Sequence, residues 1–164
     1  MMVRARLPGG LMILALLAGP AAGQTADGRA WSQDPGTRCR FVAPRSLTAG
    51  PTTWSGACPD GRASGIGMLR RRDGAVAGFA FFGKMRDGIP QLGVVDLGDG
   101  YQAGRFTAGD IGVERSVEMQ VTIDAFTIAA TAARAVSARY AAEHNAASAR
   151  YYESIAKTLE NQIE

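Results

Sequence analysis

The residues whose chemistry could serve a function are two cysteines, one histidine and a set of aspartates. A redox enzyme would carry its cysteines as Cys-x-x-Cys in a thioredoxin-like setting, whereas Cys39 and Cys58 lie far apart. A zinc site would need more ligands than two cysteines and one histidine. In an exported chain we therefore expect a structural disulfide between these cysteines, which would close a loop of about 20 residues and contribute roughly 3 kcal/mol.

Beyond Trp54, four aspartates are each followed by glycine, and their spacing indicates turns rather than catalysis. Asp60, Asp73, Asp87 and Asp99 are separated by 13, 14 and 12 residues. Asp-Gly is a strong hairpin signal, because glycine accepts a positive φ and aspartate bonds its own backbone. General acid–base catalysis would require a neighbour that perturbs a carboxyl pKa, and the sequence indicates none. This rhythm predicts a β-meander with one strand in each interval.

The other chemistry-bearing residues also favour structural roles. His144 follows Glu143 in an alanine-rich segment, which predicts a surface or cap histidine rather than a general base. The arginine run 70–72 has no interleaved aromatic residues, so we expect a solvated strand end and no nucleic-acid binding. No hydrolase, metalloprotease or phosphate-loop motif occurs in the sequence. We therefore predict no catalytic residue, no cofactor and no metal site.

The first 23 residues have the pattern of a secretory signal peptide. Arg4 and Arg6 precede a short apolar run at 11–18, and small residues follow up to Gly23, where we expect cleavage. This run is far shorter than the roughly 20 residues that span a bilayer, and we expect no transmembrane segment after it. Removing two arginines leaves 16 basic and 15 acidic residues, a net charge of +1, which points to no acidic partner. The sequence predicts an exported protein, periplasmic or secreted.

The exported part divides into three segments. Residues 24–38 are polar without an apolar period, and we expect a flexible tail there. Residues 39–112 hold the turn rhythm and should form a disulfide-stapled sheet. Residues 113–164 are rich in alanine and contain no glycine, which indicates helix. The predicted fold class is α+β, an antiparallel β-meander of hairpins followed by a C-terminal α-helical segment.

The stretch 54–69 predicts one tight β-hairpin with an indole packed on backbone. Glycines at 56, 65 and 67 alternate on the face of Trp54, and a face without side chains leaves room for its ring. We expect the ring to lie over all three glycines.

The same stretch resembles a MORN repeat (membrane occupation and recognition nexus), in which an aromatic residue and a glycine precede Gly-x-x-x-Gly-x-Gly and an aliphatic residue. A second, degraded copy begins at Phe81 and has one glycine, Gly93, where the pattern has two. A fragment of a third has Gln102 at the aromatic position. The resemblance covers residues 52–109 and implies a row of antiparallel hairpins that serves as an interaction platform without catalytic residues. Secreted bacterial members are also similar in having a first-hairpin cysteine that can pair with an upstream one.

Six aromatic residues of the predicted sheet leave two interpretations open. They could form a ligand-binding stripe or a core that a helix covers, and we favour the core because amphipathic helices need an apolar face to pack on. They are Trp54, Phe79, Phe81, Phe82, Tyr101 and Phe106.

The C-terminal segment has apolar residues at three- and four-residue steps, which indicates helix. His144-Asn145 predicts the turn of a helical hairpin with Asn145 as the cap, and one continuous helix remains the alternative. Residues 116–124 fit either a helix start or a last strand. Because a small sheet cannot easily bury both a small-residue stripe and a bulky one, we expect a face for a protein partner or self-association. Its residues are Val136, Tyr140, Tyr151, Ile155 and Leu159.

These patterns favour a non-catalytic binding or scaffolding module, with the MORN-like sheet as the platform and the helices meeting a partner or a second copy. The alternative is an enzyme, or an accessory subunit of one, that acts on cell-envelope polymers through Asp87, Asp96 or Asp99. A carboxylate pair roughly 5 to 10 Å apart in a cleft would favour this alternative. Aspartates at exposed hairpin tips would count against it.

Overall fold

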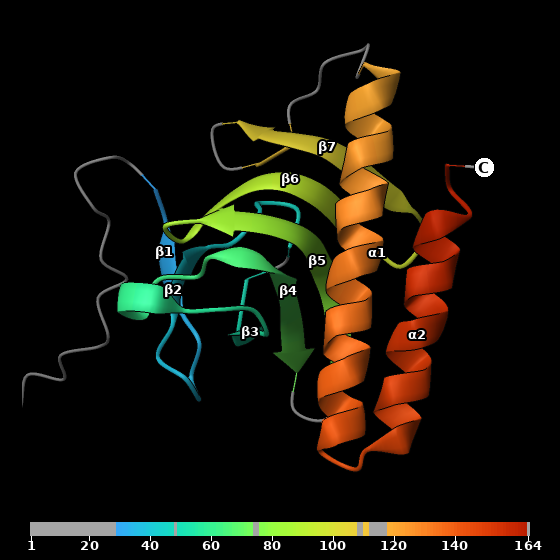
Figure 1. Cartoon of the computed structure of the whole chain (residues 1–164). Helices are drawn as coiled ribbons and strands as arrows, with labels where there is room; N and C mark the ends of the chain where they lie inside the picture. Colours follow the sequence, from blue (N-terminus) through green and yellow to red (C-terminus); the bar gives the residue numbers. More distant parts are fainter. Residues whose placement is uncertain (1–28, 48, 74–75, 108–109, 112–117, 164) are drawn as a thin grey trace, which may run out of the picture.

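The protein combines an antiparallel sheet with a C-terminal helical hairpin, so the predicted α+β class is confirmed (Figure 1). The computed structural model describes residues 29–47, 49–73, 76–107, 110–111 and 118–163, and the predicted signal peptide lies outside them. The elements are β1 (Trp31–Gln33), β2 (Arg40–Val42), β3 (Thr52–Trp54), the 3₁₀ turn η1 (Pro59–Gly61), β4 (Gly65–Asp73), β5 (Val76–Arg86), β6 (Ile89–Asp96), β7 (Tyr101–Thr107), β8 (Asp110–Ile111), α1 (Met119–Ala142) and α2 (Ala146–Glu160).

The main sheet is the predicted meander, with strand order β3-β4-β5-β6-β7-β8 and antiparallel neighbours throughout. Asp87 (φ 49°) and Gly88 (φ 81°) form the two-residue turn between β5 and β6, where both positions require positive φ. Asp60 lies in η1, and Asp99 lies in the turn that the Leu97 N–H closes onto the Gly100 carbonyl. These aspartates are exposed, as expected of turn residues.

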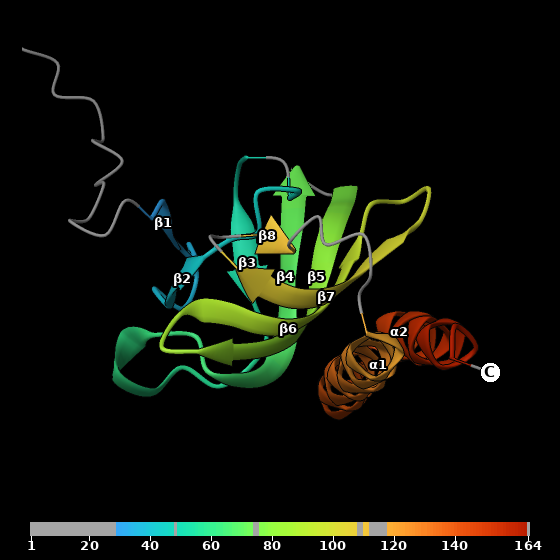
Figure 2. The ribbon, with the colours of Figure 1, turned by 90° about the horizontal axis from the view of Figure 1, so that it is seen from above.

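The two faces of the sheet carry separate apolar layers. One layer includes Met68, Phe82 and Val94 and packs under α1, which crosses β4 to β7. The other includes Leu69 and Phe81 and is covered by the chain around 39–47. Figure 2 shows the helices on one side of the sheet and β1–β2 on the other.

The six aromatic residues of the predicted stripe therefore belong to two layers rather than one surface. Phe82 and Tyr101 belong to the layer under the helix, whereas Trp54, Phe79, Phe81 and Phe106 belong to the opposite layer. Successive residues of a strand point to opposite faces, which is why neighbours such as Phe81 and Phe82 separate. The core interpretation fits this burial better than a ligand-binding stripe.

A row of four glycines crosses the centre of the sheet. They are paired in register across four neighbouring strands: Gly67, Gly83, Gly93 and Gly104. Two aromatic rings lie directly on this row. A Cβ on Gly67 would stand 2.6 Å from Trp54 Cη2, and a Cβ on Gly93 would stand 2.8 Å from Phe81 Cε2. Only glycine permits such contact. Strands β5 and β6 are visibly curved (Figure 1).

The first hairpin differs from the tight one that the sequence predicted. Trp54 pairs with Leu69, but residues 55–64 form a longer connection that includes η1 and a single bridge between Ala57 and Ser64. The Trp54 ring lies against Gly56 and Gly67, not Gly65. A Cβ on Gly65 would meet nothing within 4 Å, and the residue has φ +79°. Gly65 is therefore needed for backbone conformation rather than for ring space.

The expectation of a flexible tail through residue 38 is wrong from residue 31 onward. Strand β1 pairs with β2, and between them the Asp34 carboxylate is 3% exposed. Its Oδ1 accepts from the N–H groups of Gly36 and Thr37, and its Oδ2 accepts from the Trp54 N–H at 2.8 Å. One buried carboxylate with three backbone donors can order a polar segment that has no apolar period.

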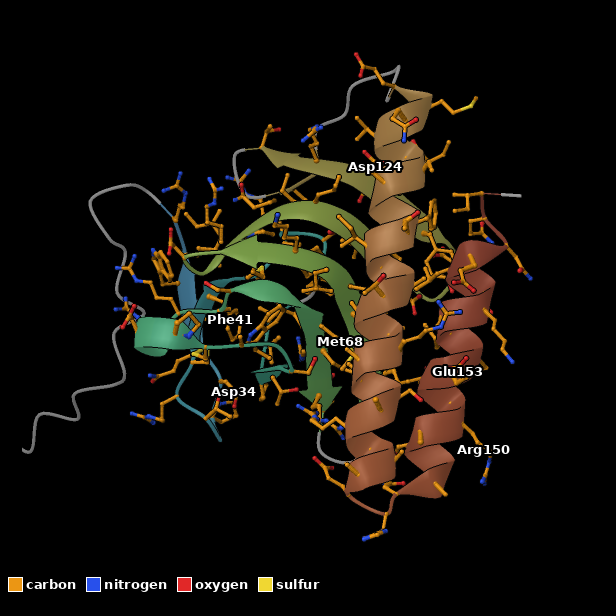
Figure 3. The ribbon with its side chains drawn as sticks, viewed as in Figure 1. Asp34, Phe41, Met68, Asp124, Arg150 and Glu153 are labelled. Atoms are coloured by element: carbon orange, nitrogen blue, oxygen red, sulfur yellow. A yellow bond between two sulfur atoms is a disulfide. The ribbon has the colours of Figure 1, made fainter. Side chains whose placement is uncertain are left out.

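The predicted disulfide between Cys39 and Cys58 is present, with the Cα atoms 6.0 Å apart. Cys39 directly precedes β2, and Phe41 of β2 is fully buried on the side of the sheet away from α1 (Figure 3). The bond thus attaches the covering segment to the first hairpin.

The predicted helical hairpin is confirmed. Asn145 caps α2 by accepting from the Ser148 N–H, and His144 takes positive φ (57°) in the turn. Helix α1 begins at Met119, so the ambiguous stretch 116–124 is helical from there, and 116–117 lie outside the described residues. By length and hydropathy α1 could cross a membrane, which we did not anticipate; its apolar face is buried on the sheet.

We expect the disulfide to contribute measurably to stability. Cys58→Ala should lower the free energy of unfolding by roughly 2 to 4 kcal/mol, because the unfolded chain regains the freedom of the closed loop. Denaturant unfolding of the oxidised protein and the variant measures this. Alkylation without reductant should modify no thiol, and stoichiometric modification would contradict the bond.

Trp54→Ala should cost about 3 to 5 kcal/mol, because a large buried ring is removed from the glycine row. Gly65→Ala should cost less, roughly 1 to 2 kcal/mol, since only backbone strain at positive φ opposes it. Thermal and denaturant melts of both variants test the distinction. A Trp54→Ala protein that melts like the parent would show that the ring does not support the sheet.

Candidate functional site

Arginine and tyrosine side chains meet where the far end of β4 approaches the helical hairpin. We call Arg70, Arg72, Tyr140, Tyr151 and Tyr152 the arginine–tyrosine cluster. Met68 lies on the helix-facing side of β4 (Figure 3). The two arginines follow it at steps of two along the strand, which places them on the same side. Because the turn after α1 brings α2 back alongside, the rings of Tyr140 and Tyr152 stack with centroids 5.5 Å apart.

Arg70 is the unusual member, since its charge is buried without a carboxylate. The residue is 3% exposed, and Nη1 donates to the Gly78 carbonyl at 3.1 Å. Its Nε and Nη2 atoms are buried and have no hydrogen-bond partner among the residues that the structure describes. Across the described ranges no acidic side chain forms an ion pair with it. A buried charge in this state is costly, and unpaired buried donors are rare in folded proteins.

Aromatic rings are the groups that face this charge. The Arg70 Cζ atom lies 5.8 Å from the ring centroid of Phe82, 5.5 Å from that of Tyr152 and 6.0 Å from that of Tyr151. Each contact is a cation–π interaction, which offsets part of the desolvation cost of the guanidinium. The rings satisfy none of its N–H groups, so two directional donors remain available.

Two tyrosines of this region, Tyr101 and Tyr152, are neutral hydroxyl groups at neutral pH. Burial raises the pKa of Tyr152, and the neighbouring Arg70 only partly opposes this. Burial, the Asp96 carboxylate and Tyr151 raise the pKa of Tyr101. Phenol groups that stay protonated cannot act as counterions to Arg70, but they can donate hydrogen bonds. The cluster therefore keeps an uncompensated positive charge beside neutral O–H groups.

The second arginine of the cluster lies nearer the surface. Arg72 is half-buried, and its Nη2 donates to the Tyr140 hydroxyl at 3.4 Å. Tyr151, on the first half of α2, is 47% exposed and is the cluster member most open to solvent. The cluster thus runs from a buried guanidinium to an exposed ring.

A second arginine–aromatic contact lies at the opposite end of the molecule and differs in exposure. Trp31 lies between the guanidinium groups of Arg40 and Arg62, at 5.3 and 5.5 Å from its ring centroid. Both arginines are exposed, so water can satisfy their remaining donors. This contact is explained by packing of β1 against the first hairpin.

The structure corrects the prediction for the arginine run 70–72. We expected a solvated strand end, and this is wrong for Arg70. Strand alternation with Met68 and Leu69 was the signal that could have placed Arg70 on an interior face, but the sequence does not say which side a helix covers. Arg71, on the other face, pairs with the exposed Asp73.

The predicted association face is largely not a surface. Val136 and Leu159 are buried, and Tyr140 and Ile155 are half-buried, because α1 and α2 pack these residues against each other and against the sheet. A bidentate contact of Arg134 with Glu160 also joins the helices. Of the five predicted residues, Tyr151 alone is well exposed.

The remaining candidates lie apart from the cluster or serve local structure. His144 is exposed in the helical turn, and Asp96 accepts from the Gly98 N–H at 2.9 Å. Within the described part of the chain no group of three or more histidine, cysteine, aspartate or glutamate side chains could hold a metal ion.

Comparisons with protein-family models, curated proteins and solved structures found no match to this chain.

The raised tyrosine pKa values predict an alkaline loss of stability. Below about pH 10, the usual pKa of tyrosine, these phenols are protonated in the folded and in the unfolded protein, so their full contribution to stability is present there. Above that pH the tyrosines of the unfolded protein ionise first, because their pKa values in the folded protein are raised. The free energy of unfolding should therefore fall as the pH rises from about 10 through the folded pKa values. Denaturant melts from pH 8 to 11, with phenolate absorbance, test this.

Tyr152→Phe is the control for the alkaline melts. It removes one of the groups with a raised pKa and should make the alkaline loss smaller. If all tyrosines of the folded parent ionised as free tyrosine does, the burial of these hydroxyls would be contradicted.

Proposed function

We propose that this chain is an exported, non-catalytic binding module whose ligand position is the arginine–tyrosine cluster. The observation that carries the proposal is Arg70, a buried guanidinium with two unpartnered nitrogens and no carboxylate partner. A group that costs stability and is not needed for packing is typical of a site retained for function. The exposed Tyr151 beside it offers a ligand an aromatic contact.

The scaffold part of the proposal is a MORN-like sheet. Two successive hairpins place an aromatic ring on a glycine of the next strand, opposite an aliphatic residue: Trp54, Gly67 and Leu69 in the first, and Phe81, Gly93 and Val95 in the second. The second hairpin reaches this arrangement with one residue fewer, because its turn is the two-residue Asp87-Gly88. This spatial repeat supports the resemblance that the sequence suggested.

The proposed location is the periplasm or the extracellular space. The disulfide between Cys39 and Cys58 supports an oxidising compartment, and the pattern of residues 1–23 supports export. Nothing in the charge balance supports a nucleic-acid partner.

The other candidate functions have weaker support. An enzyme acting on envelope polymers would use Asp87, Asp96 or Asp99. Asp87 and Asp99 are exposed in turns, however, and the Asp96 carboxylate accepts a hydrogen bond from the Gly98 N–H of a turn. A protein partner or a second copy would have to bind near Tyr151, since most of the expected association face is buried. We therefore propose that a protein partner, if it is the ligand, also binds at the arginine–tyrosine cluster.

The proposal is tested by comparing the mature chain with two variants of the cluster, Arg70→Met and Tyr151→Ser. Each is screened by thermal shift against peptides, glycan fragments and small organic acids of the cell envelope. A ligand that binds the folded state raises the melting temperature, and this shift should disappear in Arg70→Met and become no larger, and for aromatic ligands smaller, in Tyr151→Ser. Arg150→Met is the matched control, because Arg150 is an exposed arginine on the outer side of α2 (Figure 3).

Stability measurements on Arg70→Met separate function from folding. Replacing a buried, unpaired charge by an apolar side chain of similar length should leave the free energy of unfolding unchanged or raise it by about 1 kcal/mol. A large loss of stability would show that Arg70 serves the fold. Thermal shifts that persist in both cluster variants would place the ligand elsewhere and refute the proposal.

A further inference from the structure

We infer that the arginine–tyrosine cluster binds a carboxylate, held side-on by Nε and Nη2 of Arg70; this inference rests on the proposed binding function. A guanidinium carries five N–H donors in a fixed planar fork. One end of the Arg70 fork is used, because Nη1 donates to the Gly78 carbonyl. The two unpartnered nitrogens, Nε and Nη2, lie along the other edge.

The geometry of that edge matches a carboxylate. The N–H bonds of Nε and Nη2 run nearly parallel along one side of the planar group, and their spacing fits two oxygens bound to one carbon. A lysine at this position would offer the same charge without the fork. A neutral amide or hydroxyl ligand offers one acceptor oxygen, which both donors would have to share, and it brings no charge to neutralise the guanidinium.

Charge balance favours a monovalent anion. The buried charge at this point is that of Arg70, and the raised pKa of Tyr152 keeps the neighbouring phenol neutral. A carboxylate would neutralise this charge, whereas a divalent phosphate would leave excess negative charge in a buried place. Arg72 is half-buried and already directs Nη2 to the Tyr140 hydroxyl, so it is less suited to balance a second charge.

The surroundings indicate how the rest of the ligand lies. The Phe82 and Tyr152 rings beside the guanidinium are buried, whereas the Tyr151 ring, whose centroid is 6.0 Å from Arg70 Cζ, is 47% exposed and is the neighbouring ring most open to solvent. A ligand therefore reaches Arg70 by displacing the Tyr151 side chain, and its remainder lies beside that ring at the surface. Either a small organic acid or the C-terminal carboxylate of a peptide has this chemistry.

The test observes Arg70 directly through the ¹H–¹⁵N signal of its Nε–H group in the mature, disulfide-bonded protein. Sodium acetate, sodium benzoate and a tetrapeptide with a free C-terminus are titrated separately, at constant ionic strength. We expect a saturable downfield shift of the Nε proton, as in a charge-assisted hydrogen bond. Loss of the signal in Arg70→Lys assigns it.

Variants show whether binding depends on the planar guanidinium of Arg70 or only on its positive charge. Arg70→Lys should bind benzoate at least tenfold more weakly, since the charge remains but the two parallel donors are lost. Tyr151→Ala should weaken benzoate several-fold and leave acetate within about twofold, because only benzoate has a ring to contact. Arg150→Met should bind as the parent does. The signal of the parent protein carries the test even if Arg70→Lys fails to fold.

The separate titrations distinguish a peptide C-terminus from a small organic acid, and they also show whether a carboxylate binds at all. Tighter binding of the peptide than of benzoate identifies a peptide terminus, and the reverse identifies a small organic acid. The same peptide with an amidated C-terminus should not bind, and equal binding of it would overturn the inference. No saturable shift with any carboxylate would also overturn it. Equal shifts with chloride or phosphate would mean an adventitious ion only and would likewise overturn it.

Failure of this inference and failure of the proposed function give different results. A stabilising ligand that lacks a carboxylate but depends on Arg70 and Tyr151 would leave the binding module standing and refute the carboxylate. Suppose instead that carboxylates bind at Arg70 while the thermal shifts of envelope ligands persist in both cluster variants. The carboxylate inference would then stand, and the proposed position of the envelope ligand would be refuted.

Discussion

The contact of two aromatic rings with a row of backbone glycines is the constraint on which the rest of this structure depends. Trp54 and Phe81 lie where Cβ atoms would otherwise stand on Gly67 and Gly93. Rings that replace side chains bring apolar surface close to the backbone and allow the strands to curve around them. A curved sheet of this kind buries a core on its inner side although its strands are rich in glycine and carry few large side chains.

Other segments of the chain cover both faces of this sheet. The segment that begins at β2 lies over the rings, held by the buried Asp34 carboxylate and by the disulfide. Helix α1 lies on the other face, and its alanines, such as Ala129 and Ala133, permit close approach to the strands. This packing buries most of the apolar residues of the helices, which leaves little hydrophobic surface for a partner.

The arginine–tyrosine cluster lies where this packing ends. Arg70 occupies an inward position of β4 at which an apolar residue would continue the core, and aromatic rings and the Gly78 carbonyl contact its charge without neutralising it. Its two unpartnered nitrogens are directional donors. This contrast with Arg40 and Arg62, which are exposed on Trp31, is what makes the cluster the best supported place for a ligand.

Local patterns in the sequence determined much of the architecture. Asp-Gly spacing indicated the meander, two of the glycines around Trp54 indicated where its ring packs, and Asn145 indicated the helical turn, because each depends on residues close in sequence. Two cysteines in a chain whose first 23 residues have the pattern of an export signal predicted the disulfide, because their pairing has no alternative. Tertiary structure alone decided what depends on distant contacts. It ordered residues 31–38 through Asp34, separated the aromatic residues into two layers, and buried Leu159. It also made Arg70 an interior charge, because strand alternation separates the two faces of β4 but only the packing of α1 and α2 determines which face excludes water.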